Sequence, residues 1–211
     1  VQPCRPETQD LSTLSQPVCQ AVLIFLKDIK IPHKVENIAI RKGEQLCCDP
    51  DDLNPNLYKT YSEYISLTAY NVPDHWYPKL PEKRTRVDEC MAWNHALLPC
   101  MGQPTNPEKL EKVLADLDGT LDKLENVFLK NQPFLCGDDI SLADLLAVCE
   151  LMQPLCGGRD ILKDRPKLLS WRSRVHSVLS DSFDEAHSVV YQIREKFTAK
   201  LSPCSKQATL M

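Results

Sequence analysis

The chain has 211 residues, of which 43% are hydrophobic and 26% are charged, and both values are typical of a soluble globular protein. This composition argues against a disordered chain, collagen and a coiled coil, and the length fits one large domain or two small ones. The formal net charge is −4, with 25 Lys and Arg against 29 Asp and Glu, so the composition shows no basic excess for binding a polyanion and no nucleic-acid partner is expected.

The ten cysteines do not form a recognisable disulfide or metal framework. Disulfide scaffolds are typical of shorter chains, and the first ten residues contain no apolar signal segment, so we expect a cytoplasmic protein with mostly buried thiols. No C-x-x-C or H-x-x-x-H spacing occurs, and the five histidines have no catalytic spacing, so no metal site is expected. The longest apolar run, residues 21–26, is far below the ~20 residues that cross a bilayer, so no membrane span is expected.

The first third of the chain has the sparse pattern of a small α/β domain. Residues 17–30 are a predicted helix, because Pro17 suits a first turn and the apolar stretch ends before Ile31-Pro32. Residues 33–40 alternate between polar and β-branched or other apolar side chains and predict a strand. Residues 44–72 mix prolines with polar side chains and predict little regular structure.

From residue 73 onward, every periodic segment has helical spacing. We therefore place a domain boundary there, which gives an α/β domain over residues 1–72 and an all-helical domain over residues 73–211. The segment 142–152 is apolar on nearly every side, which predicts a helix in the middle of a bundle. The expected helices of this part are 82–98, 108–130, 142–152, 167–179 and 183–197.

A capping box is predicted at the start of the apolar helix. Ser141 stands at the position before the helix, and Asp144 follows three residues later, so the two residues can satisfy each other's backbone amides. Ile140 and Leu145 have the spacing of a hydrophobic staple across the same turn. This motif predicts a structural role rather than a catalytic one.

Ser15 precedes the first predicted helix, where a serine hydroxyl commonly caps the helix or a turn. A hydroxyl beside a helix N-terminus can also stabilise a bound anion such as a thiolate, because the hydroxyl donates a hydrogen bond and the helix end is positive. Lowering a thiol pKa by about two units requires ~2.7 kcal/mol, so the hydroxyl and the helix dipole would both be needed. The residues around Ser15 do not decide between capping the helix and stabilising a thiolate.

The order of several short motifs resembles that of the cytosolic glutathione transferases, and of the theta class in particular. The resemblance runs from about residue 11 to about residue 186. Its motifs are Leu14-Ser-Gln-Pro17, Ile31-Pro32, Lys42-Gly43, Asn54-Pro55, Val72-Pro-Asp-His-Trp-Tyr-Pro78, Arg86-Val-Asp-Glu89 with Trp93 and His95, Ile140-Ser-Leu-Ala-Asp144, Glu150-Leu-Met-Gln-Pro154, and Arg165-Pro-Lys-Leu168 with Trp171-Arg172.

The resemblance implies a thioredoxin-like N-terminal domain, an all-helical C-terminal domain, a homodimer, and transfer of glutathione onto small hydrophobic electrophiles. It gives Ser15 the catalytic role of stabilising the glutathione thiolate. It places Gln16, Gln45 and Glu63 in contact with glutathione, with Gln45 at a position where a histidine is common. Glutathione enters as a co-substrate, and no further cofactor or metal is implied.

The chain also lacks two segments of the family pattern. Between Asn54-Pro55 and Val72-Pro73 it is short by about one β-hairpin, which in the family carries contacts to glutathione, so the N-terminal domain is expected to be truncated. After His95, a short segment replaces the far half of a helix that borders the electrophile pocket. These departures leave two alternatives to an active enzyme, namely a catalytically impaired or inactive binding or dimerisation protein of the same fold, and a splice-type product.

Overall fold

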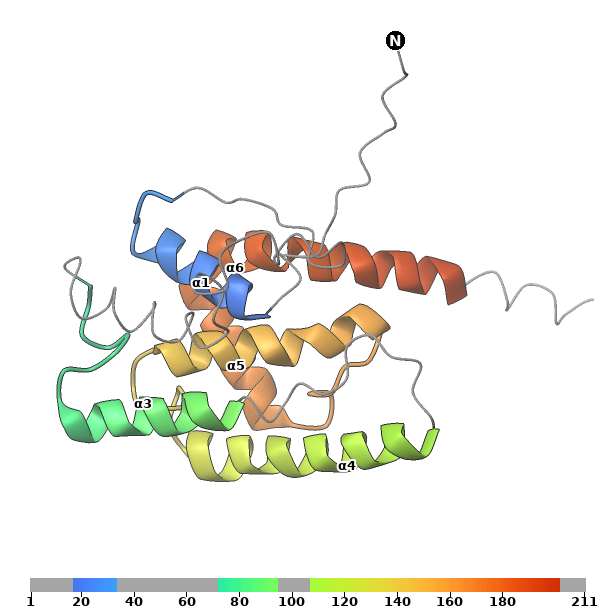
Figure 1. The fold of residues 1–211 in the computed structure, drawn as a ribbon, viewed down its shortest axis with the longest axis horizontal. Helices are drawn as coiled ribbons and strands as arrows, with labels where there is room; N and C mark the ends of the chain where they lie inside the picture. The colour runs from blue at the N-terminus through green and yellow to red at the C-terminus, as the bar shows by residue number, and fades with distance from the viewer. Residues whose placement is uncertain (1–16, 34–71, 95–106, 202–211) are drawn as a thin grey trace, which may run out of the picture.

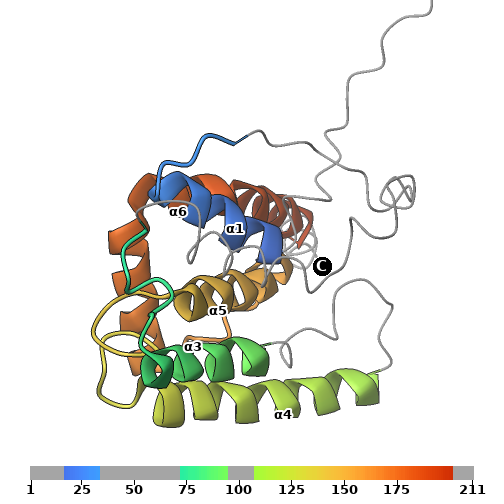
Figure 2. The ribbon, with the colours of Figure 1, turned by 60° about the vertical axis from the view of Figure 1, so that its left-hand side comes forward.

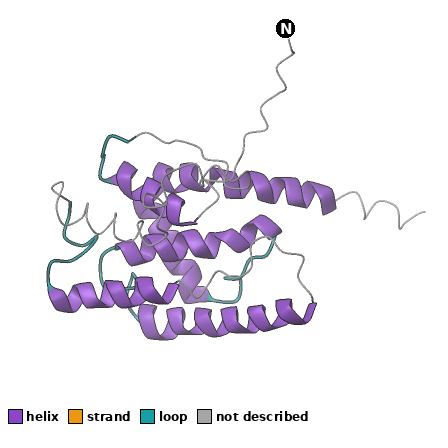
Figure 3. Cartoon of the chain, viewed as in Figure 1, coloured by secondary structure: helices purple, strands orange, loops and turns teal. Residues whose placement is uncertain are grey.

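The computed structural model describes residues 17–33, 72–94 and 107–201 of the chain. The regular elements in these ranges are helical, as the purple ribbon of Figure 3 shows. They are α1 (Pro17–Asp28), α3 (Pro81–Asn94), α4 (Pro107–Lys123), the π-helical turn η5 (Leu124–Leu129), α5 (Leu142–Met152), the 3-10 turn η6 (Gln153–Gly157) and α6 (Pro166–Leu201). The predicted strand 33–40 and the hairpin region 44–72 lie outside the described residues, apart from His33 and Val72.

Helix α5 is the central element of the bundle. It contacts α1 and α6 on one side and α3 on the other, and α3 and α4 run side by side beneath it in both views (Figures 1 and 2). Ten of its eleven residues are buried, with Leu146 half-buried. The prediction of a buried apolar helix over residues 142–152 is therefore confirmed, including both ends.

The capping box that begins α5 is also confirmed, and its acid has additional partners. Ser141 and Asp144 form the box, in which the Ser141 amide donates to Oδ2 of Asp144 at 3.0 Å and the Ser141 hydroxyl donates to the same oxygen at 2.8 Å. The other oxygen, Oδ1, accepts from the Leu135 amide at 2.9 Å and from the Trp171 indole at 2.8 Å. Burial raises the pKa of this carboxyl, and the four donors act in the opposite direction. The box therefore joins α5 to the preceding loop and to α6.

The predicted helix over residues 108–130 is present, but its last turns are wider than those of an α-helix. Residues 124–129 form η5, and the guanidinium of Arg86 on α3 donates to the Val127 carbonyl at 2.9 Å. The same guanidinium lies over the Phe128 ring, 4.5 Å from its centroid. Leu121, Leu124 and Phe128, which follow helical spacing in this segment, are buried.

The two helices predicted over residues 167–179 and 183–197 form one element, α6, with a kink between them. Ser180 has non-helical backbone angles, with φ 43° and ψ −121°, at the predicted break. Helix α3 begins at Pro81, one residue before the predicted start, and residues 95–98 of its predicted span lie outside the described ranges. The predicted starts of these helices therefore agree with the structure to within one residue, apart from the second half of α6, which continues from the kink, whereas α1 ends two residues before its predicted end and α6 continues four residues beyond its predicted end.

The hydrophobic core crosses the expected domain boundary. Ile24 and Phe25 of α1 are buried in the same cluster as Trp76, Leu145 and Val190. The Phe25 and Trp76 rings meet edge to face, with their centroids 5.4 Å apart. Burial of large side chains on both sides of residue 72 therefore attaches α1 firmly to the helical part.

Candidate functional site

The predicted site residues Ser15, Gln16, Gln45 and Glu63 all lie outside the described residues. The described chain begins at Pro17, directly after the Ser15-Gln16 pair, and Pro17 is the first residue of α1. The start of α1 is therefore the described feature that is nearest in sequence to the predicted catalytic serine. The prediction that the helix begins at Pro17 is confirmed.

The start of α1 has the properties of an anion-binding helix end. The first turn carries no acidic side chain, so the positive end of the helix dipole is not neutralised by the helix's own first-turn side chains. Pro17 is buried, and its fixed backbone angle and missing N–H suit this position. A negative group placed at this end of α1 is stabilised by the dipole, by about 0.3–1 kcal/mol when exposed and up to about 2 when partly buried.

A buried pair of amide side chains fixes the first turns of α1 against the junction between α5 and η6. The amide nitrogen of Gln153 donates to the amide oxygen of Gln20 at 3.0 Å and also contacts the Cys149 carbonyl at 3.2 Å. Gln20 is fully buried and Gln153 is 3% exposed. The pair lies one turn from Pro17, so it sets the position of the helix end that follows Ser15.

The far end of α1 is held by two further contacts. Lys27 forms an ion pair with Glu185 of α6. The Trp76 ring packs on Phe25 of α1, and the His75 ring lies against Trp76. His75 also hydrogen-bonds through Nδ1 to the Ile140 carbonyl at 2.7 Å. The motif around residues 72–78 therefore connects α1, the loop before α5 and α3.

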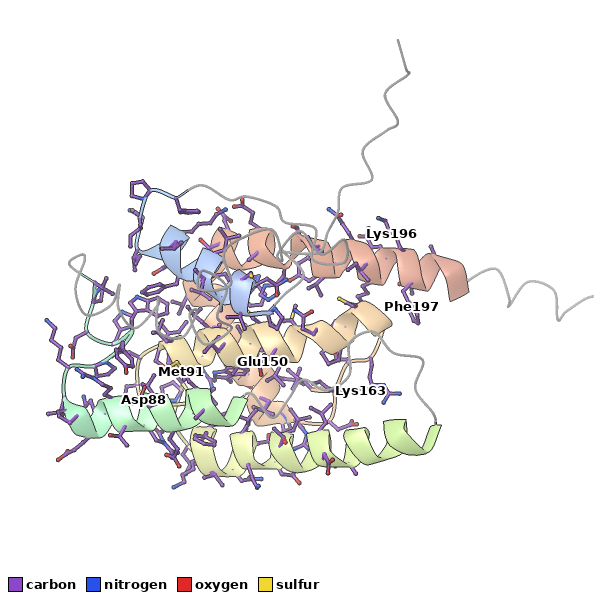
Figure 4. All side chains as sticks on the ribbon, viewed as in Figure 1. Asp88, Met91, Glu150, Lys163, Lys196 and Phe197 are labelled. Carbon is purple, nitrogen blue, oxygen red and sulfur yellow. The ribbon has the colours of Figure 1, made fainter. Side chains whose placement is uncertain are left out.

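Glu150 is a buried acid in α5 for which the sequence pattern predicts no role. Its side chain is 5% exposed, its Oε2 atom has no hydrogen-bond partner among the described residues, and burial raises its pKa to about 8. Figure 4 shows Glu150 on α5, with Asp88 and Met91 on the neighbouring α3. Glu150 precedes Gln153 by one turn, so the two residues share a face of the helix. An acidic residue within an otherwise apolar helix was the signal that could have identified it.

The described residues contain no group of three or more His, Cys, Asp or Glu side chains that could hold a metal ion. None of the helices in these ranges is both long and apolar enough to cross a membrane. An open pocket of about 560 Å³ lies beside the start of α6, where Lys130, Lys167 and Arg174 contribute to its lining. This pocket contains none of the predicted site residues.

Comparison with known proteins identifies the family of the chain. The model of the glutathione S-transferase C-terminal domain matches residues 90–177. Glutathione S-transferase theta-3 of Mus musculus is 40% identical over 215 residues, covering 88% of this chain and 88% of the relative. Glutathione S-transferase theta-1 of Bos taurus is 38% identical over 229 residues, covering 95% of this chain and 94% of the relative.

Solved structures agree with these relatives. Human glutathione transferase theta-2 in complex with glutathione and an unknown ligand superposes with a TM-score of 0.77 at 32% identity, covering 89% of this chain and 88% of that one. The apo form of human glutathione S-transferase T1-1 gives a TM-score of 0.75 at 34% identity, covering 90% of this chain and 94% of that one. The resemblance stated from the motifs and the predicted fold class are both confirmed, and the chain belongs to the theta class of the glutathione S-transferase family.

Proposed function

We propose that this chain transfers the thiol of glutathione onto small hydrophobic electrophiles and that the Ser15 hydroxyl stabilises the glutathione thiolate. The observation that carries the proposal is the start of α1, a fixed helix N-terminus without acidic side chains in its first turn that follows Ser15 by two residues. Its theta-class relatives are glutathione S-transferases, and the human theta-2 structure to which it is similar is a complex with glutathione and an unknown ligand.

The chemistry of thiolate stabilisation fits this position. A charge-assisted hydrogen bond from a hydroxyl contributes about 1.5–3 kcal/mol, and the helix dipole adds up to about 2. Together these contributions match the ~2.7 kcal/mol that a two-unit fall of a thiol pKa requires. The attacking sulfur then forms the new C–S bond, and the leaving group departs with the electron pair of the bond that breaks. Gln16, Gln45 and Glu63 are the proposed contacts to the remainder of glutathione.

The proposal also includes a homodimer, a cytoplasmic location and a boundary between a glutathione-binding domain over residues 1–72 and a helical domain over residues 73–211. The buried contact between Gln20 and Gln153 supports an arrangement in which the helical part fixes the position of the glutathione-binding helix. Glutathione is the co-substrate, and no metal takes part in the proposed reaction.

Retention on immobilised glutathione, followed by turnover of a small electrophile, tests the proposal. We expect the parent chain to be retained on glutathione and to convert the electrophile. In Ser15→Ala we expect both glutathione affinity and the turnover rate to fall by at least about tenfold, because one charge-assisted hydrogen bond is worth about 1.4 kcal/mol or more. Ser173→Ala is a matched control, since Ser173 is an exposed serine of α6 whose hydroxyl donates within its own helix to Leu169 at 3.0 Å.

Two other outcomes correspond to the alternatives. A well-folded dimer that is neither retained nor active would overturn the proposal in favour of a non-catalytic binding or dimerisation protein, which the continuous helical core supports. A chain that aggregates and does not unfold cooperatively would favour the splice-type product, because an incomplete sheet leaves strand edges without partners.

A further inference from the structure

Two cysteines that are far apart in the sequence lie together at the contact between α3 and the loop before α5. Cys90 is fully buried on α3, and Cys136 is half-buried in the loop between Phe134 and Gly137. The Cys136 thiol donates to the Arg86 carbonyl, one helical turn before Cys90, with a sulfur–oxygen distance of 3.7 Å. This contact places the Cys136 thiol beside the turn of α3 that carries Cys90, and the interaction with Cys136 raises the pKa of the Cys90 thiol.

We propose that Cys90 and Cys136 are a thiol-disulfide modification site that takes a low-molecular-weight disulfide, such as glutathione disulfide, as its oxidant. The inference is independent of the transferase activity proposed above, because neither sulfur belongs to the predicted catalytic site.

The surroundings give the two sulfurs different roles. Cys136 is the accessible partner, because its side chain is half-buried and Asp138 and Asp139, which follow in the same loop, are exposed. Cys90 has no solvent-exposed surface, and both its interaction with Cys136 and its burial raise the pKa of its thiol. A buried protonated thiol is a poor first nucleophile. Cys136 is therefore the attacking residue and Cys90 the resolving residue.

The reaction balances in two exchanges. The Cys136 thiol loses its proton to solvent, its sulfur attacks one sulfur of glutathione disulfide, and the S–S bond breaks with release of one glutathione thiolate. The Cys90 sulfur, losing its own proton, then attacks Cys136 Sγ and releases the second glutathione thiolate. Two protein thiols lose two electrons and two protons, and one glutathione disulfide is reduced to two glutathione molecules after protonation.

The loop geometry favours the second exchange. A backbone hydrogen bond of 3.1 Å from the Phe134 amide to the Gly137 carbonyl closes the short turn that carries Cys136, and the neighbouring Leu135 amide is bonded to Asp144. Both anchors hold Cys136 against α3. An intramolecular disulfide there covalently joins α3 to the capping-box loop.

The test incubates the full chain in buffers of varied glutathione to glutathione disulfide ratio, quenches thiol exchange with acid, alkylates the remaining thiols in denaturant and maps the peptides by mass spectrometry. We expect a Cys90–Cys136 linked peptide that grows as the ratio becomes more oxidising and disappears on addition of dithiothreitol. In Cys136→Ser the linked peptide is lost and Cys90 stays alkylatable. In Cys156→Ser it persists, and this control is matched because Cys156 is also half-buried and its thiol also points to a backbone carbonyl, that of Val190 at 3.9 Å.

Two results would overturn the inference. One is a stable mixed disulfide at Cys136 with Cys90 still free at every ratio. The other is the absence of any modification of either residue under conditions that oxidise the other half-buried cysteines. Cys136→Ser replaces a loop residue that is not fully buried, and far-ultraviolet circular dichroism verifies that this variant is folded before the peptides are compared.

Discussion

The indole N–H of Trp171 donates a hydrogen bond of 2.8 Å to Oδ1 of Asp144, and both side chains are fully buried. Trp171 belongs to α6 and Asp144 to the first turn of α5, so this contact joins the two helices at the point where α5 begins. The capping acid therefore has a tertiary role in addition to its local one.

Replacement of Asp144 tests this role. Asp144→Ala leaves the Trp171 indole and the backbone amides of Leu135 and Ser141 without their acceptor, and each buried donor without a partner costs about 1–3 kcal/mol. We expect the free energy of unfolding to fall by about 3 kcal/mol or more in a urea titration. Asp164→Ala removes an exposed aspartate and serves as the control, with an expected change within about 0.5 kcal/mol. Equal stability of the two variants would contradict the assignment.

The Gln20–Gln153 contact gives a second prediction. Gln20→Ala removes the acceptor of a buried amide, so we expect a loss of about 1–3 kcal/mol in the free energy of unfolding. The variant is also expected to bind glutathione more weakly, because the start of α1 loses a contact that fixes its position.

A double-mutant cycle separates this contact from simple loss of packing. Gln20→Ala combined with Gln153→Ala should cost less than the sum of the two single changes, by about 0.5 kcal/mol or more. Gln192→Ala, at an exposed position of α6, should leave both stability and glutathione affinity unchanged. Strict additivity of the two buried substitutions would show that the hydrogen bond contributes nothing.

His187 predicts a loss of stability in acid. The imidazole is fully buried, its Nδ1 donates to the Phe183 carbonyl at 2.8 Å, and burial lowers its pKa from 6.5 to about 4. The folded chain therefore prefers the neutral ring, while the unfolded chain binds a proton below pH 6.5. The contribution of the buried neutral ring to the free energy of unfolding is complete above pH 6.5. It falls progressively, by about 3 kcal/mol, as the pH is lowered to 4.

His187→Asn removes this titration and tests the sign. The variant is less stable than the parent at pH 7.5, because a packed ring is replaced by a smaller group. The difference between the two chains should shrink as the pH falls from 6.5 to 4, measured by urea unfolding at each pH. His33→Asn, at an exposed position, is the control, and its stability should depend on pH as that of the parent does. The prediction is refuted if His187→Asn lowers the free energy of unfolding by the same amount at every pH.

Glu150 predicts the opposite dependence on pH. Its folded-state pKa of about 8 lies above the ordinary value of 4.5, so the folded chain prefers the protonated acid. Its contribution to stability is complete below pH 4.5 and declines as the pH rises to 8, on the order of 4 kcal/mol. Glu150→Gln keeps a neutral side chain of similar shape and should be more stable than the parent at pH 8 and similar to it at pH 4.5.

Thermal and urea unfolding of the parent and Glu150→Gln at both pH values measure this effect. Glu195→Gln, at an exposed position of α6, is the control and should differ little from the parent at either pH. A Glu150→Gln variant that is destabilised at pH 8 would mean that the ionised carboxylate has a favourable partner in the folded chain.

Local sequence patterns determined most of the helical part. Helix α5 begins and ends where its capping box and its apolar run predict, because both signals lie within a few residues of each end. The break in α6 falls in the polar segment around Ser180, between two amphipathic stretches. The order of short motifs was sufficient to indicate the theta class.

The sequence by itself therefore determined the helices, their order and the family, since these depend on residues that are close along the chain. Only the tertiary structure decided that α1 shares its core with the helical domain, that Glu150 has an unpartnered oxygen among the described residues, and that Cys136 lies beside the turn of α3 that carries Cys90. These features depend on contacts between distant segments, and neither helical periodicity nor motif spacing carries information about which buried faces meet.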